Sequence, residues 1–359
     1  PDVVRFGEAV GAHTNFDRFR SPSVVPDWAK DDREEGHDGW LMLALTGHSD
    51  APVPVILDSP NGESWSVLGK LSFNGDPGFN EDEVPATSPI PPVVSPRLVR
   101  LRDEVDGEIY DVLFVTLERA GRDVSGYIVG RLDGTEFTVS KGFQLVDFGH
   151  DFSRPRNTNT TTGTIAQEHR YDRAVILGLL NGNGRGDDAT KHPTWEAEGW
   201  ANSLSLPRAV TLQGGVLYQT PAQGLPDAVK LSDYAQSWTG VLEVPKGSSV
   251  TVTLRDGSGD PAVVIRHTGE DISLDRSMSK AFDYYFKDSA PAVAPLAEGD
   301  SDTLTIIQDG ASVEVFVDGG LVAMSSRVYF DGGCSDIEVS TEGEAVIEQS
   351  WSRTGSKRS

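Results

Sequence analysis

Residues 309–320 read Asp309-Gly310-Ala311-Ser312-Val313-Glu314-Val315-Phe316-Val317-Asp318-Gly319-Gly320. A run rich in β-branched and aromatic residues stands between two Asp-Gly pairs, which is typical of a strand closed at both ends by tight turns. Similar short runs recur along the whole chain, whereas helical periodicity is almost absent. We therefore predict an all-β protein, with strands that include residues 40–46, 110–117, 127–132, 249–254, 303–307, 312–317 and 336–339.

The composition describes a soluble globular protein and excludes several kinds of partner. Of the 359 residues, 37% are hydrophobic, and no apolar run approaches the length needed to cross a bilayer. The 55 acidic residues against 31 basic residues give a net charge of −24, which repels nucleic acid phosphates and anionic membrane surfaces. We therefore expect neither a nucleic acid nor a membrane as a partner.

Candidate metal ligands are sparse. Cys334 is the single cysteine, which excludes an intrachain disulfide and a multi-cysteine zinc site, and we expect it to be a buried small side chain. The seven histidines are scattered, with no two at metal-ligand spacing on one predicted element, so we predict no metal site and no cofactor. The sequence begins at Pro1 without a charged-then-apolar leader, and localisation stays open. An extracellular location is favoured over the cytoplasmic alternative.

The pattern of strand and turn signals divides the chain into two domains. Strands with turn signals such as Asp133-Gly134 fill residues 1–217, a spacing expected of a propeller or a barrel. A connector that contains Pro and Gly follows at 218–228, and strands of a different texture resume over 229–351, which suits a β-sandwich. Residues 352–359 are a polar tail that we expect to fray. The acidic, proline-containing stretch 75–96 is predicted to be a long surface loop, and a pocket wall is its functional alternative.

Five parts of the chain resemble, in order, landmarks of glycoside hydrolase family 32. The stretch 309–320 with the following Ser326-Arg327-Val328-Tyr329 is similar to the signature of that family's sandwich domain. The other four are residues 127–137, Asp147-Phe148-Gly149-His150-Asp151-Phe152, Gly199-Trp200 with Ser205-Leu206-Pro207-Arg208, and Ile272-Ser273-Leu274-Asp275-Arg276-Ser277. Together the similar segments cover nearly the whole chain.

This resemblance implies a five-bladed β-propeller, incomplete in this chain, followed by a C-terminal β-sandwich, with residues 1–217 as blades 2–5. It also implies the chemistry of a retaining β-fructosidase or fructosyltransferase that acts on sucrose or fructans. In such an enzyme one carboxylate attacks the anomeric carbon and a second protonates the departing oxygen. A third carboxylate, in an Arg-Asp-Pro motif of the family, holds fructose hydroxyls and supports the transition state.

The positions expected for these carboxylates hold other residues. The Arg-Asp-Pro motif aligns with Arg20-Ser21-Pro22, where Ser21 replaces the carboxylate, and the acid/base position aligns with Val94 in Val94-Ser95-Pro96. In the family the nucleophile belongs to the first blade, for which the residues before Arg20 are too few. We therefore expect it to lie outside this chain or not to exist, and a separate chain that supplies the blade is one alternative. If the alignment is displaced near the acidic loop, the fallback acids are Glu81, Asp82 and Glu83.

Other residues retain the chemistry of a sugar site. Aromatic faces stack on the apolar side of a sugar ring, a carboxylate accepts hydroxyl hydrogens, and a serine hydroxyl hydrogen-bonds a sugar without bringing charge. The predicted substrate-binding residues are Arg20, Ser21, Asp151, Phe152, Arg156 and Trp200.

Two functions remain open on the sequence alone. The chain belongs to a fructan- or sucrose-processing β-fructosidase or fructosyltransferase whose nucleophile lies elsewhere, or it is a catalytically inactive relative that binds a fructan or another glycan. Ser21 and Val94 favour the inactive relative, and membership of an enzyme family favours the enzyme. The expected ligand is a fructose-containing saccharide, and for the inactive relative another glycan is the alternative.

Overall fold

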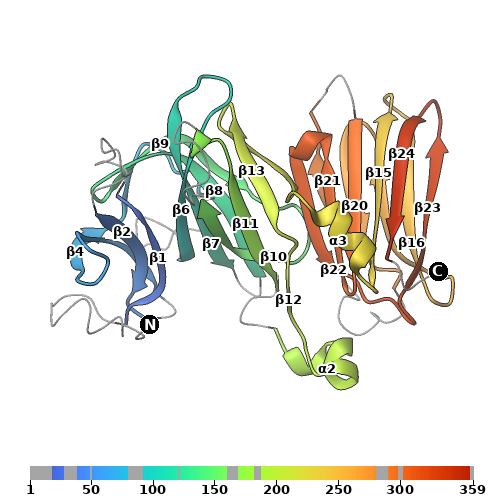
Figure 1. The fold of residues 1–359 in the computed structure, drawn as a ribbon, viewed down its shortest axis with the longest axis horizontal. Helices are drawn as coiled ribbons and strands as arrows, with labels where there is room; N and C mark the ends of the chain where they lie inside the picture. Colours follow the sequence, from blue (N-terminus) through green and yellow to red (C-terminus); the bar gives the residue numbers. More distant parts are fainter. Residues whose placement is uncertain are drawn as a thin grey trace. The chain divides into compact units, whose positions relative to one another are not determined.

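The computed structural model of the chain describes residues 18–27, 39–48, 51–79, 92–119, 122–159, 169–181, 187–279, 290–297 and 302–355. Strands dominate these residues, as Figure 1 shows, and the prediction of an all-β protein is confirmed. The helices in the described part are short, and none of them has the length and apolar character required to traverse a bilayer.

Two sheets form from residues 20–145. The first has the order β1-β2-β3-β4, with β1 (Arg20–Pro26), β2 (Trp40–Thr46), β3 (Val53–Ser59) and β4 (Ser66–Lys70). The second has the order β5-β9-β8-β7-β6, with β5 (Ser72–Asn74), β6 (Val93–Arg102), β7 (Ile109–Arg119), β8 (Arg122–Asp133) and β9 (Glu136–Leu145). The hairpin-connected strands of both sheets pair antiparallel, and β5 is added to the second sheet by a parallel pairing with β9.

A third sheet precedes the sandwich. Its order is β10-β11-β13-β14, with β12 paired to β11, for β10 (Phe152–Asn159), β11 (Ala174–Leu180), β12 (Ser203–Leu204), β13 (Arg208–Gln213) and β14 (Val216–Pro221). The described residues therefore contain three sheets before the sandwich, where the resemblance led us to expect four blades. The assignment of blade numbers stays a prediction.

Contacts divide the chain into two compact units. The first unit comprises Pro1–Val146, Ser153–Ile176 and Thr211–Val216, and the second comprises Asp147–Phe152, Leu177–Val210 and Leu217–Ser359. The predicted boundary cut the chain once, at 218–228, whereas the observed division falls within strands of the third sheet. Part of the predicted propeller sequence therefore belongs to the same compact unit as the sandwich.

The core of the first unit follows from strand alternation. Side chains that point to one face are buried together, because β-branched and aromatic residues at every second position pack best when they leave water. The cluster includes Leu43, Ile56, Leu98, Leu113, Ile128 and Phe137, each at most 1% exposed. This packing holds the first two sheets together within the unit.

The second unit contains a β-sandwich, as predicted. One sheet has the order β22-β21-β20-β15-β24, with β15 (Ala235–Glu243), β20 (Asp302–Asp309), β21 (Ser312–Val317), β22 (Val322–Arg327) and β24 (Val346–Thr354). The other has the order β19-β18-β17-β16-β23, with β16 (Ser249–Asp256), β17 (Pro261–His267), β18 (Asp271–Asp275), β19 (Ala292–Pro295) and β23 (Cys334–Glu342). Both sheets contribute side chains to one apolar core, which also takes in Cys334 at 3% exposure.

Two predicted connections are corrected. The linker at 218–228 contains the end of β14 and the start of helix α3 (Leu225–Leu231), because proline is tolerated in the first turn of a helix and the Pro/Gly signal was taken only as a break. The predicted tail begins inside β24, which runs to Thr354 and pairs with β15. The predicted loop 75–96 ends earlier than expected, since β6 begins at Val93.

Candidate functional site

Each early sheet has one edge strand that lies beside an edge strand of the next: β1 in the first sheet, β6 in the second and β10 in the third. In the first unit, Nη1 of Arg97 on β6 donates to the carbonyl oxygen of Ser21 on β1 at 3.0 Å. Nη1 of Arg156 on β10 donates to Oγ of Ser95 on β6 at 2.7 Å. The strands β1, β6 and β10 are therefore adjacent in this order, and we call them the first strands.

The first strands share an unusual backbone conformation. Ser21, Ser95 and Arg154 have φ values of 54°, 55° and 48°, in the left-handed region, and each residue directly precedes a proline. The strand pairings of β1 with β2 and of β6 with β7 are irregular at these points. Left-handed residues other than glycine cost on the order of 1–3 kcal/mol each, and such strain concentrates at functional sites. The repetition marks this end of the first strands as a candidate site.

The two predicted catalytic positions fall at this site. Ser21 adjoins the irregularity in β1, and its carbonyl oxygen is held by Arg97. Val94 is 4% exposed and lies next to Ser95 in β6. The fallback acids Glu81, Asp82 and Glu83 lie outside the described residues.

The composition of the first strands is basic. Across their described residues β1, β6 and β10 contain no Asp or Glu, and they carry six arginines: one in β1, three in β6 and two in β10. In a chain with net charge −24, this concentration is unusual. The arrangement cannot supply a carboxylate pair from these strands.

Three of these arginines have contacts within the first unit, two of them with carboxylates. Nε of Arg154 contacts Oδ2 of Asp123 at 2.7 Å, and Nε of Arg100 contacts Oδ1 of Asp111 at 2.9 Å. Arg20, which we predicted to bind substrate, donates to the carbonyl oxygens of Gly47 at 2.6 Å and His48 at 2.9 Å. These contacts tie the three side chains to the protein.

Arg97 and Arg156 differ from Arg100 and Arg154 in their partners. Within the described part of the chain, neither has a carboxylate at ion-pair distance. Burial, together with the positive charge of Arg156, lowers the pKa of Arg97 to about 10. Burial and the charge of Arg154 likewise lower the pKa of Arg156. Sequence reasoning named Arg156 but missed Arg97, although Ser95-Pro96-Arg97 repeats the pattern Arg154-Pro155-Arg156.

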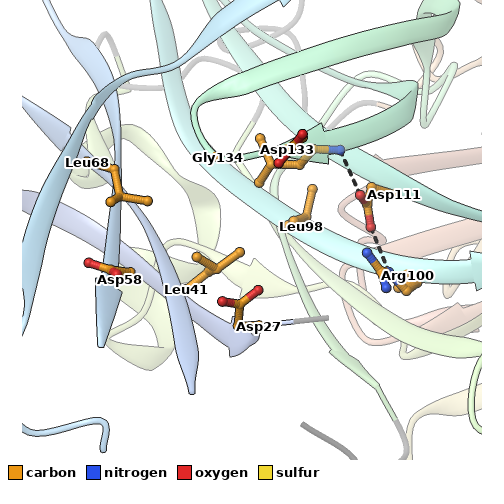
Figure 2. Close-up of a pocket in the computed structure, with 10 residues that line it drawn as sticks. Asp27, Leu41, Asp58, Leu68, Leu98, Arg100, Asp111, Asp133 and Gly134 are labelled. Carbon is orange, nitrogen blue, oxygen red and sulfur yellow. Dashed lines mark hydrogen bonds and ion pairs between the residues drawn. The ribbon is translucent and has the colours of Figure 1, made fainter. Parts of the chain in front are cut away.

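A pocket of about 220 Å³ in the first unit has several acidic side chains on its wall (Figure 2). Its lining includes Asp27, Asp58, Asp111 and Asp133 among leucines, but neither Ser21 nor Val94. Asp111 is already occupied, because it pairs with Arg100 and accepts from the backbone N–H of Leu132 at 2.8 Å. The volume is below the range of about 300–1,000 Å³ typical of ligand sites, so we assign no site to it.

Asp151 and Phe152, two further predicted sugar contacts, are buried in the second unit. Asp151 is 1% exposed, contacts Arg276 through Oδ2, and accepts from Nη2 of Arg327 at 3.0 Å. These two arginines outweigh the effect of burial and hold the pKa of Asp151 well below its usual range. Phe152 is 5% exposed and lies against the guanidinium of Arg208, 4.4 Å from its ring centre. Both residues have structural contacts, and their burial does not favour a sugar contact.

Arg208 is the centre of a second buried network in the same unit. It is fully buried, and its Nη2 donates to Asp147 at 2.7 Å and to Glu314 at 3.0 Å. Burial raises the pKa of both carboxyl groups, with Arg208 opposing the shift. A Cβ added at Gly149 would lie 2.2 Å from the carbonyl oxygen of Ser325, so only glycine fits beside Asp147 here.

Trp200, the last predicted sugar contact, lines a pocket of the second unit. The pocket has a volume of about 830 Å³, and its wall combines Trp200, Tyr234 and Tyr329 with acidic groups such as Glu198. The indole N–H of Trp200 donates to Oε2 of Glu198 at 2.7 Å. Aromatic faces with nearby carboxylates suit a sugar, but no predicted site residue other than Trp200 lines this pocket.

One group of the second unit has the composition of a metal site. His267, Asp302 and Asp318 place possible ligand atoms within 4.8 Å of one another. Nδ1 of His267 accepts from the backbone N–H of Gly269 at 3.1 Å, which leaves the ring proton on Nε2. A metal on Nε2 would need a proton on Nδ1, where it would meet the N–H of Gly269. The geometry therefore fits a histidine that faces carboxylates better than it fits a metal centre.

Curated proteins similar to this chain are sucrose-cleaving enzymes of bacteria. A sucrose-6-phosphate hydrolase of Bacillus subtilis (strain 168) is 25% identical over 368 aligned positions, which cover 96% of this chain and 67% of that protein. A sucrose-6-phosphate hydrolase of Staphylococcus xylosus is 24% identical over 61% of this chain and 45% of its own length. The chain thus spans between about half and two thirds of these two relatives.

Solved structures with a similar fold include a fructofuranosidase from Schwanniomyces occidentalis complexed with fructosylnystose, with a TM-score of 0.69 and 19% identity over 93% of this chain and 69% of that one. An exo-inulinase from Aspergillus awamori has a TM-score of 0.68 and 18% identity over 93% of this chain and 66% of that one. Structures of this group have a β-propeller followed by a C-terminal β-sandwich.

Two family descriptions match almost the entire sequence. Residues 9–221 match the glycosyl hydrolases family 32 N-terminal domain, and residues 223–352 match the family 32 C-terminal region. The resemblance predicted from the motifs is confirmed. The chain belongs to glycoside hydrolase family 32.

Proposed function

We propose that this chain recognises a fructose-containing saccharide at the irregular ends of its first strands, and that these strands do not supply the carboxylates for cleavage. One observation carries the proposal: β1, β6 and β10 hold Ser21 and Val94 at the expected catalytic positions and contain no acid. The relatives bind or cleave such saccharides, which supports the choice of ligand.

The chemistry explains why binding without cleavage is the better proposal. Retaining hydrolysis needs two carboxyl groups about 5–5.5 Å apart, one as nucleophile and one as acid/base. Val94 has no proton to donate, and Ser21 brings no negative charge toward an oxocarbenium-like transition state. The loss of one such electrostatic contact is worth about 3–4 kcal/mol of barrier.

A second candidate is an active β-fructosidase or fructosyltransferase. The names of the curated relatives favour it, since they are hydrolases of sucrose 6-phosphate. It requires carboxylates from outside the described residues, with Glu81, Asp82 and Glu83 as the fallback acids. A separate chain that supplies a further blade is the other route to such groups.

The deciding experiment measures binding and cleavage in parallel. The chain is incubated with sucrose, inulin and levan, released fructose is followed, and binding is measured by calorimetry. We expect saccharide binding without fructose release. Release abolished by a Glu81→Gln, Asp82→Asn or Glu83→Gln change would overturn the binding proposal in favour of the enzyme.

The doubly substituted variant Ser21→Asp/Val94→Glu sharpens the test. It restores two of the three expected carboxylates without adding a nucleophile, so we expect no fructose release above the unsubstituted chain. The measurement is fructose release from sucrose over long incubations, with circular dichroism as a control for folding. Clear hydrolysis by this variant would show that the nucleophile is already present in the chain.

A further inference from the structure

We propose that the first strands form an oxyanion site, in which Arg97 and Arg156 bind a phosphate or carboxylate group of an acidic saccharide. This inference rests on the proposed function, because it specifies the ligand class of the same site. The expected ligand is then a negatively charged saccharide and not a neutral one.

The first argument is charge compensation. A buried charge is normally paired, because an isolated ion loses far more hydration than backbone contacts return. Arg97 is 5% exposed, and in the described part of the chain its partners are the carbonyl oxygens of Pro96 and Ser21. Two acids of the same unit, Asp123 and Glu118, contact the neighbouring Arg154 at 2.7 Å and 3.8 Å. An anionic ligand would supply the missing charge.

The second argument is the hydrogen-bonding geometry. Both guanidinium groups are anchored through Nη1 alone, with Arg97 on the Ser21 carbonyl and Arg156 on Ser95 Oγ. Within the described residues, Nε and Nη2 of each group make no hydrogen bond. Such a fixed planar fork matches the two oxygens of a carboxylate or phosphate. The anchoring orders the side chains before any ligand arrives.

The third argument concerns the structural alternative, in which the arginines only brace neighbouring strands. Asn157 on β10 already makes such a brace, since its Nδ2 donates to the carbonyl oxygen of Leu98 on β6 at 2.9 Å. A neutral amide therefore suffices to link two first strands. Bracing does not explain why two guanidinium groups that have no carboxylate partner among the described residues act on each other, one of them buried.

The experiment compares ligands that differ in charge. Calorimetry on the full chain measures fructose, fructose 6-phosphate, galacturonate and inorganic phosphate at low salt. We expect fructose 6-phosphate or galacturonate to bind at least about tenfold more tightly than fructose, the gain of one charge-assisted contact, and we expect added phosphate to compete. The better of the two acidic sugars identifies the anionic group.

Variants separate this role from a structural one. Arg156→Gln keeps a donor for Ser95 and should reduce the preference for the acidic sugar about tenfold, and Arg156→Lys should restore part of it. The matched control is Arg131→Gln in the same unit, whose exposed side chain pairs with Glu108 at 3.0 Å, and it should leave binding unchanged. Arg97→Gln is the second test, with its unfolding curve recorded to exclude loss of the fold.

The outcomes are distinguishable. If phosphate binds but no sugar does, the oxyanion site stands and the saccharide proposal fails. If fructose and its acidic analogues bind equally and phosphate does not compete, the saccharide proposal stands and the oxyanion site is overturned. If Arg156→Gln and Arg131→Gln have the same effect on binding, the assignment to the first strands is also overturned.

Discussion

The buried arginines of the second unit and the arginines Arg97 and Arg156 of the first strands differ in whether a carboxylate of the protein pairs with them. Arg208 contacts two carboxylates, and Arg276 and Arg327 share Asp151. Arg97 and Arg156 have no carboxylate partner within the described residues. The buried arginines that pair with carboxylates serve the fold, whereas buried Arg97 and exposed Arg156, without such a partner among the described residues, are available to a ligand.

The same comparison explains which part of the sequence resembles the family. Four of the five family-like segments meet in the second unit: Asp147 and Asp151 come from one, Arg208 from the next, Arg276 from the third, and Glu314 and Arg327 from the last. These networks hold the sandwich-containing unit together. Much of the similarity to the family therefore lies in segments that form structural ion pairs, whereas the positions proposed for the catalytic acids hold Ser21 and Val94.

The largest loss of free energy of unfolding is expected from Arg208→Met. This change leaves Asp147 and Glu314 buried without their cation, which should lower the free energy of unfolding by about 3–5 kcal/mol. Because burial already raises the pKa of both carboxyl groups, the variant should lose less stability at pH 5 than at pH 8, where protonation no longer relieves the charge. Urea unfolding at the two pH values provides the measurement.

The control for this prediction is Arg131→Met in the first unit. Arg131 and Glu108 are 59% and 64% exposed, so their ion pair should contribute no more than about 1 kcal/mol. Equal losses for Arg208→Met and Arg131→Met would mean that the buried network does not serve the stability of the fold.

A smaller loss of stability is expected from Asp151→Asn, because the amide keeps an acceptor oxygen for Arg276 and Arg327. We expect a loss of about 2–3 kcal/mol at neutral pH. The pKa of Asp151 is lowered in the folded protein, so its contribution is complete above the unfolded value of about 4 and declines as the pH falls below it. The stability difference between the wild type and Asp151→Asn should therefore shrink between pH 5 and pH 3.

The smallest effect on stability is expected from Arg156→Gln. The side chain is exposed and contributes one hydrogen bond to Ser95, which glutamine can replace, so the change should remain within about 1 kcal/mol. Removal of a positive charge near Arg97 offsets part of any loss. A destabilisation as large as that of Arg208→Met, measured by the same urea titration, would erase the distinction between the two regions.

Much of the fold could be predicted from local patterns. The predicted strands 40–46 and 312–317 coincide with β2 and β21, because apolar runs bounded by turn residues specify both ends of a strand. The run 127–132 identified only part of β8, which begins at Arg122 because its pairing with β7 continues through polar residues. Helix α3 was missed, since Gly224 and the following proline also fit a loop.

The candidate site was less predictable, because its chemistry depends on distant partners. The predicted surface loop 75–96 included Val94, which lies in β6, and the predicted strands did not include the residues of β1. Whether an arginine is paired cannot be read from its neighbours, since Arg276 and Asp151 are 125 positions apart and Arg97 reaches Ser21 across 76. Burial of Asp151 was equally invisible, so a residue in a family-like motif was taken for a sugar contact.

The left-handed backbone at Ser21 has a consequence for how readily this protein can change its chemistry. Aspartate and asparagine adopt that conformation several times more often than most residues, so an aspartate at position 21 would need no rearrangement of the chain. Valine, leucine or isoleucine there would be strongly strained. The main chain at this position is therefore compatible with an acidic side chain, which a single substitution would introduce.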